Sequence, residues 1–194
     1  MIDEQFSYLI CLDLEYTCWE NSMRNNWPDP QFPAEVIQVG MASFDMTKNQ
    51  CLAKFSSYVR PVLNPRLSDY CINLLQIPQS TIDNSPALPE VIDQISSFVN
   101  GYSKDSTIVC AYGPDSKRFA DDAARHYRDS PLDSFTYLNL QQEAGKVLGR
   151  TDKLPGRDYI KEYFQLPPSE NRHDALDDAL DVKLLLDTLV EYEK

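Results

Sequence analysis

Two acidic side chains follow an apolar segment near the start of the chain. Residues 7–13 (SYLICLD) fit a buried strand, and Asp13 and Glu15 lie two positions apart at its end. Alternate side chains of a strand lie on the same face, so the two carboxylates are presented together. Close like charges repel, and a hard divalent cation such as Mg²⁺, which prefers oxygen ligands, offsets that repulsion. The alternative is a strand that ends in a polar loop.

A further acid lies in the segment CAYGPDSKRF. Gly113 and Pro114 break a predicted buried strand over 106–111 (STIVCA), and Asp115 then begins a helix. This residue is therefore a second candidate metal ligand, brought from a distant part of the sequence. Aspartate is also a good N-cap, so capping of the helix is the competing interpretation.

The last cluster is NRHDALDDALD, with aspartates at 174, 177, 178 and 181. On a helix the i,i+4 pairs repel by about 0.2–0.5 kcal/mol each, which the helix dipole relieves in part and a bound cation relieves further. His173 and Asp178 lie about 140° apart on a continuous helix. They share a site only if His173 lies at or before the helix start. An exposed acidic first turn is the competing interpretation.

Strands and amphipathic helices must position these groups. The apolar patterns predict strands over 7–13, 35–44, 51–60, 106–111 and 134–138. They predict a short helix from Tyr70, a helix from Asp115, and helices over 87–100, 139–149, 156–164 and 174–192. This order predicts one α/β domain over 1–194, with a mixed sheet flanked by helices. Sites in such folds lie at the carboxyl ends of strands, where Asp13 and Asp115 meet if their strands are neighbours.

The composition narrows the class of protein. Hydrophobic residues make up 42% and charged residues 25%, as in a soluble globular protein, and no apolar run is long enough to span a membrane. The five cysteines form no CxxC pair and no secretion signal is evident, so we expect a cytoplasmic location. The net charge of −12 argues against a protein that coats long nucleic acid. It is compatible with an enzyme that grips one end, because cations neutralise acids clustered at a metal site.

The three acidic motifs, in this order, resemble those of the DEDDh exonucleases. The similarity runs nearly end to end and is closest to the exoribonucleases related to the histone-mRNA 3′ exonuclease and the enhanced-RNAi nuclease. The segments that carry it are DLEYTCW at 13–19, EVIQVG at 35–40, YVRPVLNPRLSDYC at 58–71 and HDALDDA at 173–179. The chain departs from the family in AYGPD around Asp115, where relatives often have a Trp, and in its long loop at 20–34.

The resemblance implies a ribonuclease-H-like fold with a mixed five-stranded sheet flanked by helices. It implies two Mg²⁺ or Mn²⁺ ions and, as their ligands, Asp13, Glu15, Asp115 and Asp178. His173 is then the general base, since its pKa suits proton transfer near neutral pH. Paired ions of this kind clamp the attacking and leaving oxygens of a phosphoryl displacement. The product is a nucleoside 5′-monophosphate.

The terminal nucleotide needs a flat apolar partner, because base stacking contributes about 1–3 kcal/mol and tolerates any sequence. By position in the resemblance, Tyr70 is the first candidate and Tyr112 the second, and Thr17 is expected to touch the terminal sugar. Trp27, in the loop at 20–34, either borders the cleft or lies in a plain surface loop. A mildly basic stretch guides the backbone or is a solvated face, and it comprises Lys146, Arg150, Lys153, Arg157 and Lys161.

We therefore expect a 3′-5′ exonuclease that acts on the 3′ end of single-stranded RNA or DNA and favours RNA. A DNA exonuclease of the proofreading or repair type is the nearest alternative, since no residue is placed to recognise the 2′-OH. A binding module that kept the fold but lost catalysis is a different class. The intact set of mutually repelling acids counts against it. A phosphodiesterase for small oligomers is a fourth possibility.

Overall fold

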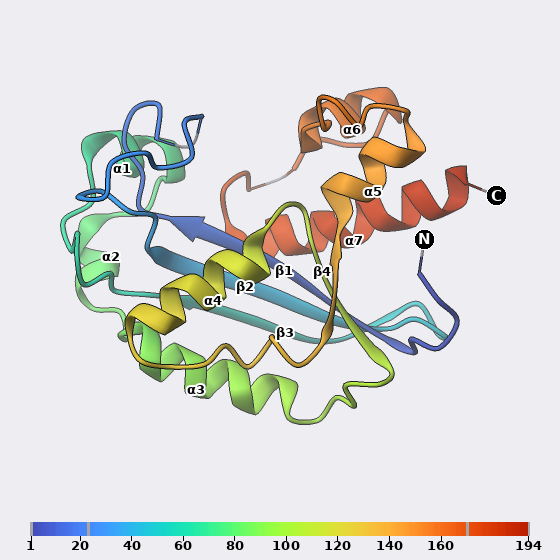
Figure 1. The fold of residues 1–194 in the computed structure, drawn as a ribbon, viewed down its shortest axis with the longest axis horizontal. Helices are drawn as coiled ribbons and strands as arrows, with labels where there is room; N and C mark the ends of the chain where they lie inside the picture. Colours follow the sequence, from blue (N-terminus) through green and yellow to red (C-terminus); the bar gives the residue numbers. More distant parts are fainter. Residues whose placement is uncertain (1, 23, 170, 194) are drawn as a thin grey trace.

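The computed structural model describes residues 2–22, 24–169 and 171–193, within which five strands form one mixed sheet (Figure 1). The strand order is β3–β2–β1–β4–β5. The central strand β1 (Tyr8–Tyr16) is antiparallel to β2 (Val36–Asp45) and parallel to β4 (Thr107–Ala111). The edge strand β3 (Gln50–Tyr58) is antiparallel to β2, and β5 (Thr136–Asn139) is parallel to β4. The predicted mixed five-stranded sheet is confirmed.

Helices cover both faces of the sheet. The described residues form α1 (Asp69–Leu75), α2 (Gln79–Asp83), α3 (Leu88–Val99), α4 (Asp115–Arg125), α5 (Leu140–Val147), α6 (Arg157–Tyr163) and α7 (Ala175–Tyr192). The sequence predicted each of them except α2, whose five residues are too few to show a helical period. Within the described parts of the chain, no helix has the length and apolarity needed to cross a membrane.

The side chains of β1 point alternately to the two faces of the sheet. Ile10 and Leu12 point into the core cluster that contains Phe119 of α4, whereas Leu9 and Cys11 belong to the cluster formed with α7. Figure 1 shows α7 crossing one face of the sheet, with α3 and α4 on the other. Asp13 and Glu15 continue the odd-numbered series. Their carboxylates therefore emerge on the face that α7 covers.

The first strand extends three residues beyond its predicted end. Asp13 pairs with Gly40 of β2 and Glu15 pairs with Gln38, so β1 ends only at Tyr16. Both acids are buried, at 4% and 7% exposure. The interpretation of this segment as a strand that ends in a polar loop is therefore wrong. The ladder hydrogen bonds to β2 hold both acids in place.

The start of α7 lies directly on β2. A Cβ atom built on Gly40 would lie 2.0 Å from the carbonyl carbon of Ala175, so only glycine permits this approach. Asp174 caps the helix by accepting hydrogen bonds from the amides of Leu176 and Asp177. Its other oxygen accepts a hydrogen bond from Gln38 Nε2 at 2.9 Å. These contacts fix the first turn of α7 next to the carboxylates of β1.

Candidate active site

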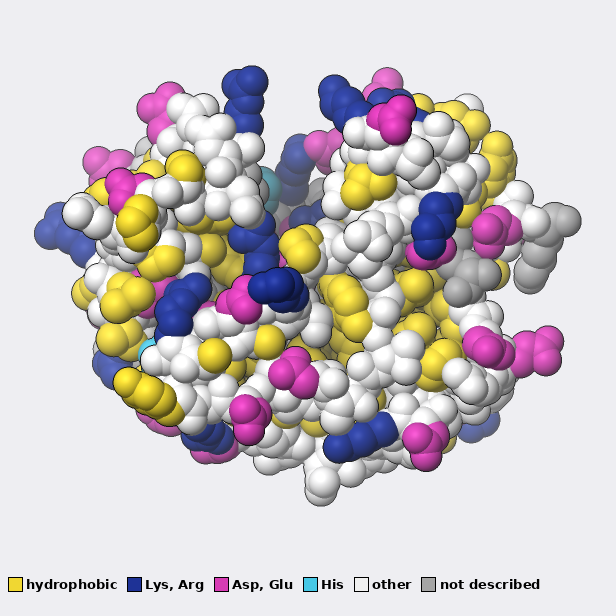
Figure 2. Space-filling model, in the orientation of Figure 1, with side chains coloured by type: hydrophobic (Ala, Val, Ile, Leu, Met, Phe, Trp, Pro, Cys, Tyr) yellow, Lys and Arg dark blue, Asp and Glu magenta, His cyan; other side chains and the backbone are white. Residues whose placement is uncertain are grey.

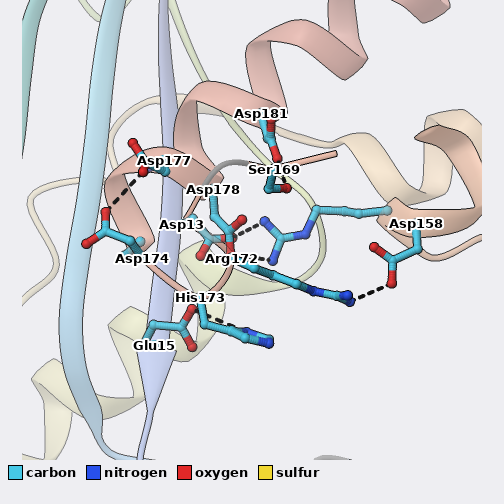
Figure 3. A network of polar contacts seen from close by, with 12 residues as sticks. Asp13, Glu15, Asp158, Ser169, Arg172, His173, Asp174, Asp177, Asp178 and Asp181 are labelled. Carbon is cyan, nitrogen blue, oxygen red and sulfur yellow. Dashed lines mark hydrogen bonds and ion pairs between the residues drawn. The ribbon is translucent and has the colours of Figure 1, made fainter. Parts of the chain in front are cut away.

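Four of the five predicted catalytic and metal-binding residues line one cavity of about 390 Å³ at the carboxyl end of β1, a size within the usual range for ligand sites. They are Asp13, Glu15, Asp115 and His173. Asp178 of α7 joins them, because Glu15, His173 and Asp178 each offer a ligand atom within 4.8 Å of the others. Figure 3 shows Asp13, Glu15, His173 and Asp178 gathered around the first turn of α7. The structure thus brings together the five groups on which the sequence-based hypothesis depends.

Asp115 enters the cavity from the start of α4. Pro114 occupies the N-cap position of this helix and no side chain caps it, so the interpretation of Asp115 as a cap is wrong. The carboxylate instead accepts a hydrogen bond from the hydroxyl of Tyr16, with 2.9 Å between the oxygens. The preceding turn contains Gly113 at φ 136°, a conformation that favours glycine. Tyr137 supports this turn by donating to the Gly113 carbonyl oxygen.

His173 precedes α7 and is not part of it. The helix begins at Ala175, and His173 has a φ of 68°, in the left-handed region that costs energy for residues other than glycine. The chain reversal places its Nδ1 atom 4.0 Å from Glu15 Oε1. The sequence predicted that His173 and Asp178 can share a site only if His173 lies at or before the helix start. The structure meets this condition, since His173 precedes the helix and Asp178 lies inside it. Asp177 points elsewhere and accepts a hydrogen bond from Asn171.

The carboxylates lie in an environment that disfavours their charge. Burial raises the pKa of Asp13 well above its usual range, with Asp115 and Glu15 adding to the rise and Arg157 opposing it. Burial and the charge of Asp178 raise the pKa of Glu15 to about 9. Burial also raises the pKa of Asp115 to about 6, although the hydrogen bond from Tyr16 lowers it. Carboxylates of this kind are stabilised in their charged form by a cation, so the donor set fits a divalent metal site.

The imidazole of His173 has the opposite tendency. Burial lowers its pKa from the usual value of 6.5, and the nearby charge of Asp178 offsets this only in part. The ring is therefore neutral at neutral pH and able to accept a proton. A neutral base beside carboxylates that a bound cation holds in their charged form is a combination suited to hydrolysis by metal-activated water.

Arg157 is a member of the site that the sequence placed only in a basic stretch. Its Nη1 atom donates to Asp13 Oδ1 and its Nη2 atom to Asp178 Oδ2, each at 3.1 Å. The other residues of that stretch for which the structure gives contacts point elsewhere: Lys146 pairs with Glu143, Lys161 with Asp181, and Arg150 stacks on Tyr159. No sequence spacing distinguishes Arg157 from these neighbours. It reaches the carboxylates because of how the segment between α5 and α7 folds.

The three predicted nucleotide contacts have different surroundings. Thr17 is buried, and its hydroxyl donates to the Pro33 carbonyl oxygen and accepts from the Glu35 amide. Its side chain therefore holds the loop, and the expected contact of Thr17 with the terminal sugar stays a prediction. Tyr112 lines the cavity, with its hydroxyl donating to the Pro155 carbonyl oxygen. Tyr70 lies on α1 with 39% exposure, outside the residues that line the cavity.

The loop at 20–34, apart from Met23, lies within the described residues and borders the cavity through Trp27. The indole Nε1 donates to the Thr17 carbonyl oxygen at 2.8 Å, and the guanidinium of Arg118 lies 4.7 Å from the centre of the ring. Of the two interpretations of this loop, the one in which it borders the cleft is confirmed. Figure 2 shows a cleft between the side that carries α1 and this loop and the side that carries α5 and α6, with basic side chains at its mouth.

The sheet order and the acidic cluster at the end of the central strand define a nuclease-type member of the ribonuclease-H-like fold. The chain belongs to the exonuclease family whose model, RNase_T, matches residues 10–185. It is 26% identical over 199 residues to the 3′-5′ exonuclease crn-4 of Caenorhabditis elegans, covering 95% of this chain and 63% of the relative. It is 35% identical over 96 residues to the 3′-5′ exonuclease eri1 of Schizosaccharomyces pombe, covering 50% of this chain and 30% of the relative.

Among solved structures, the nuclease domain of 3′hExo, described as a DEDDh family member bound to rAMP, superposes with a TM-score of 0.83. The alignment covers 98% of this chain and 94% of that one at 21% identity, a level that establishes the fold. The resemblance to the DEDDh exonucleases is thereby confirmed. The chain spans less than two thirds of the length of the two relatives compared above.

Proposed function

We propose that this protein is a metal-dependent 3′-5′ exonuclease that releases nucleoside 5′-monophosphates from single-stranded nucleic acid and favours RNA. The observation that carries this proposal is the convergence of four buried carboxylates and one neutral histidine at the carboxyl end of β1. Membership of the exonuclease family and the names of the relatives support the reaction and its direction. The ribonucleotide bound to a structural neighbour supports the preference for RNA. One domain, 1–194, carries the activity.

The cations are two Mg²⁺ or Mn²⁺ ions. Their proposed protein ligands are the carboxylates of Asp13, Glu15, Asp115 and Asp178, since hard cations of this size take oxygen ligands. When bound, the ions stabilise charge on the scissile phosphate and lower the pKa of the attacking water. Tyr16 holds Asp115 in orientation through its hydroxyl. Asp13 and Glu15 are held by the strand ladder, so the ligand set is largely preorganised.

The role of His173 is to accept the proton of the attacking water at a ring nitrogen. Its lowered pKa keeps the ring neutral before the reaction, and its position outside the helix turns it toward Glu15. The positive charge that His173 gains is stabilised by the neighbouring charge of Asp178. This pairing lets the ring take up a proton and release it to solvent after each cleavage.

The terminal nucleotide lies between the acidic cluster and the apolar wall of the cavity. Trp27 and Leu75 form that wall, and Tyr112 lines the same cavity. An aromatic wall suits base stacking without sequence preference. Arg118 lines the cavity as well and supplies positive charge toward the phosphate backbone. Tyr70, on the exposed surface of α1, is a further proposed stacking partner for the terminal base.

The experiment compares 3′-labelled with 5′-labelled strands of RNA and DNA, with Mg²⁺, Mn²⁺ or EDTA. We expect the 3′ label to leave first as a mononucleotide and the 5′ label to form a ladder that shortens by single nucleotides, faster on RNA. Internal fragments, or equal activity in EDTA, would contradict the mechanism. Binding of RNA without cleavage would indicate an inactive module, and turnover limited to dinucleotides a small-oligomer phosphodiesterase.

A further inference from the structure

A basic side chain lies inside the acidic cluster. Arg157, the first residue of α6, bridges Asp13 of β1 and Asp178 of α7 with two hydrogen bonds of 3.1 Å. The arginine side chain is 28% exposed and both acids are nearly fully buried. Guanidinium is always protonated in proteins, so in this structure a positive charge lies between two acids proposed as metal ligands.

In this arrangement the guanidinium of Arg157 and a divalent cation compete for the same carboxylates. Each neutralises the same two carboxylates, and the two positive charges repel when both are present. The guanidinium also needs an anionic partner wherever it lies, because a partly buried charge without one is costly. A phosphate presents two oxygens to the planar fork of arginine, as a carboxylate does. Arg157 lines the cavity in which we place the nucleotide, so a phosphate there lies within its reach.

We propose that Arg157 is a positioning residue that competes with the cations for Asp13 and Asp178 and transfers to the nucleotide phosphate when the cations bind. Metal and nucleotide therefore bind cooperatively, each raising the affinity for the other by the same factor. This inference rests on the proposed function. Its consequence is that the active site completes its metal set mainly when a 3′ end is present.

The nearby Arg118 shows that position, and not charge alone, gives Arg157 this role. Arg118 lies over the rings of Trp27 and Tyr16 and donates a hydrogen bond to Asn26. Within the described residues, its guanidinium is not hydrogen-bonded to a carboxylate. Arg128 provides a matched control outside the cavity, since it pairs with Asp93 of α3. Replacement of Arg128 removes the same charge without touching the site.

The test is calorimetric titration of Mn²⁺ into EDTA-treated, dialysed protein, with and without adenosine 5′-monophosphate. For the wild type we expect the nucleotide to tighten Mn²⁺ binding about tenfold, equivalent to about 1.4 kcal/mol. Arg157→Gln should bind Mn²⁺ about tenfold more tightly than wild type without nucleotide. It should gain clearly less from the nucleotide than the wild type does, because only the direct attraction between metal and phosphate remains. Arg128→Gln should match the wild type in both titrations.

Two further observations keep the outcome interpretable. Circular dichroism checks the fold of Arg157→Gln. If that variant is unfolded, Arg157→Lys replaces it, because lysine keeps the charge but lacks the two-pronged donor group of arginine. We expect the coupling between Mn²⁺ and nucleotide to be weaker in Arg157→Lys than in the wild type. Unchanged or weaker Mn²⁺ affinity in folded Arg157→Gln, or coupling equal to wild type in either variant, overturns the inference. If the wild type cleaves RNA from the 3′ end and still shows no coupling, the inference fails alone. If it takes up no Mn²⁺ and degrades nothing, the proposed function fails with it.

Discussion

Substitution of Gly40 by alanine tests how the fold assembles the site. Gly40 pairs with Asp13 across the strand ladder, and the start of α7 rests on it. The added Cβ atom would lie 2.0 Å from the carbonyl carbon of Ala175 and 2.2 Å from the amide nitrogen of Leu176. Both are backbone atoms, so rotation of a side chain cannot relieve the overlap.

The size of the effect follows from these distances. Cβ contacts under 3.0 Å are essentially never observed, so the start of α7 must recede from β2 by about 1 Å or more. His173 and Asp178 flank Ala175 and move with it, whereas Asp13 and Glu15 stay on β1. A displacement of about 1 Å among catalytic groups costs on the order of 100-fold in rate. Overpacking costs about 1–3 kcal/mol, or roughly 2–12 °C in Tm.

The assay combines kcat on 5′-labelled single-stranded RNA with the Tm from differential scanning fluorimetry. Gly101→Ala is the matched control, since a Cβ atom there meets nothing within 4 Å, and it should keep the wild-type rate and Tm. Gly40→Ala should lose most of its turnover at temperatures well below its Tm. A folded Gly40→Ala protein with a wild-type rate would refute the reasoning that this contact sets the site geometry.

Four further predictions concern the site and its support. Asp13→Ala and His173→Ala should each abolish most turnover with an unchanged circular dichroism spectrum, and near-normal rates in both would refute the assignment. Trp27→Leu should raise KM for RNA by roughly 5- to 150-fold through lost stacking, and an unchanged KM would remove Trp27 from the substrate wall. Since the pKa of His173 lies below 6.5 and its neutral form is the base, kcat/KM should fall as the pH drops through a midpoint below 6.5, and a midpoint above 7 argues against His173. Glu35 accepts three backbone amides, so Glu35→Gln should cost about 1–3 kcal/mol in chemical denaturation, and an unchanged midpoint would show that those bonds contribute nothing.

Much of the fold could be predicted because the sequence patterns are local and unambiguous. The apolar run of β1 indicated a central strand, and the amphipathic period of α7 indicated the long helix that covers it. Asp13 and Asp115 could be placed at one sheet edge on the condition that their strands are neighbours, and the parallel pairing of β1 with β4 meets that condition. The end of β1 was placed three residues too early, because polar residues hide the pairing with β2 that extends it.

The contributions of other residues depend on long-range packing that local patterns do not encode. Arg157 reaches Asp13 across 144 positions of sequence, and in composition it resembles the lysines and arginines around it. Trp27 reaches the cavity because its indole is bonded to the Thr17 carbonyl oxygen. Thr17 was assigned to the substrate from its position after the DLE motif, whereas its side chain faces the loop. The direction in which a side chain points beyond the end of a strand can be read only from the tertiary structure.

The most direct measurement is anomalous diffraction from crystals soaked with Mn²⁺ and a nucleoside 5′-monophosphate. We expect two manganese peaks among the carboxylates of Asp13, Glu15, Asp115 and Asp178, with a ring nitrogen of His173 facing them. Asp13→Ala crystals should lose at least one of the two peaks. Peaks that lie elsewhere on the protein, or no ordered manganese at saturating concentration, would contradict the account of this cavity as a two-metal active site.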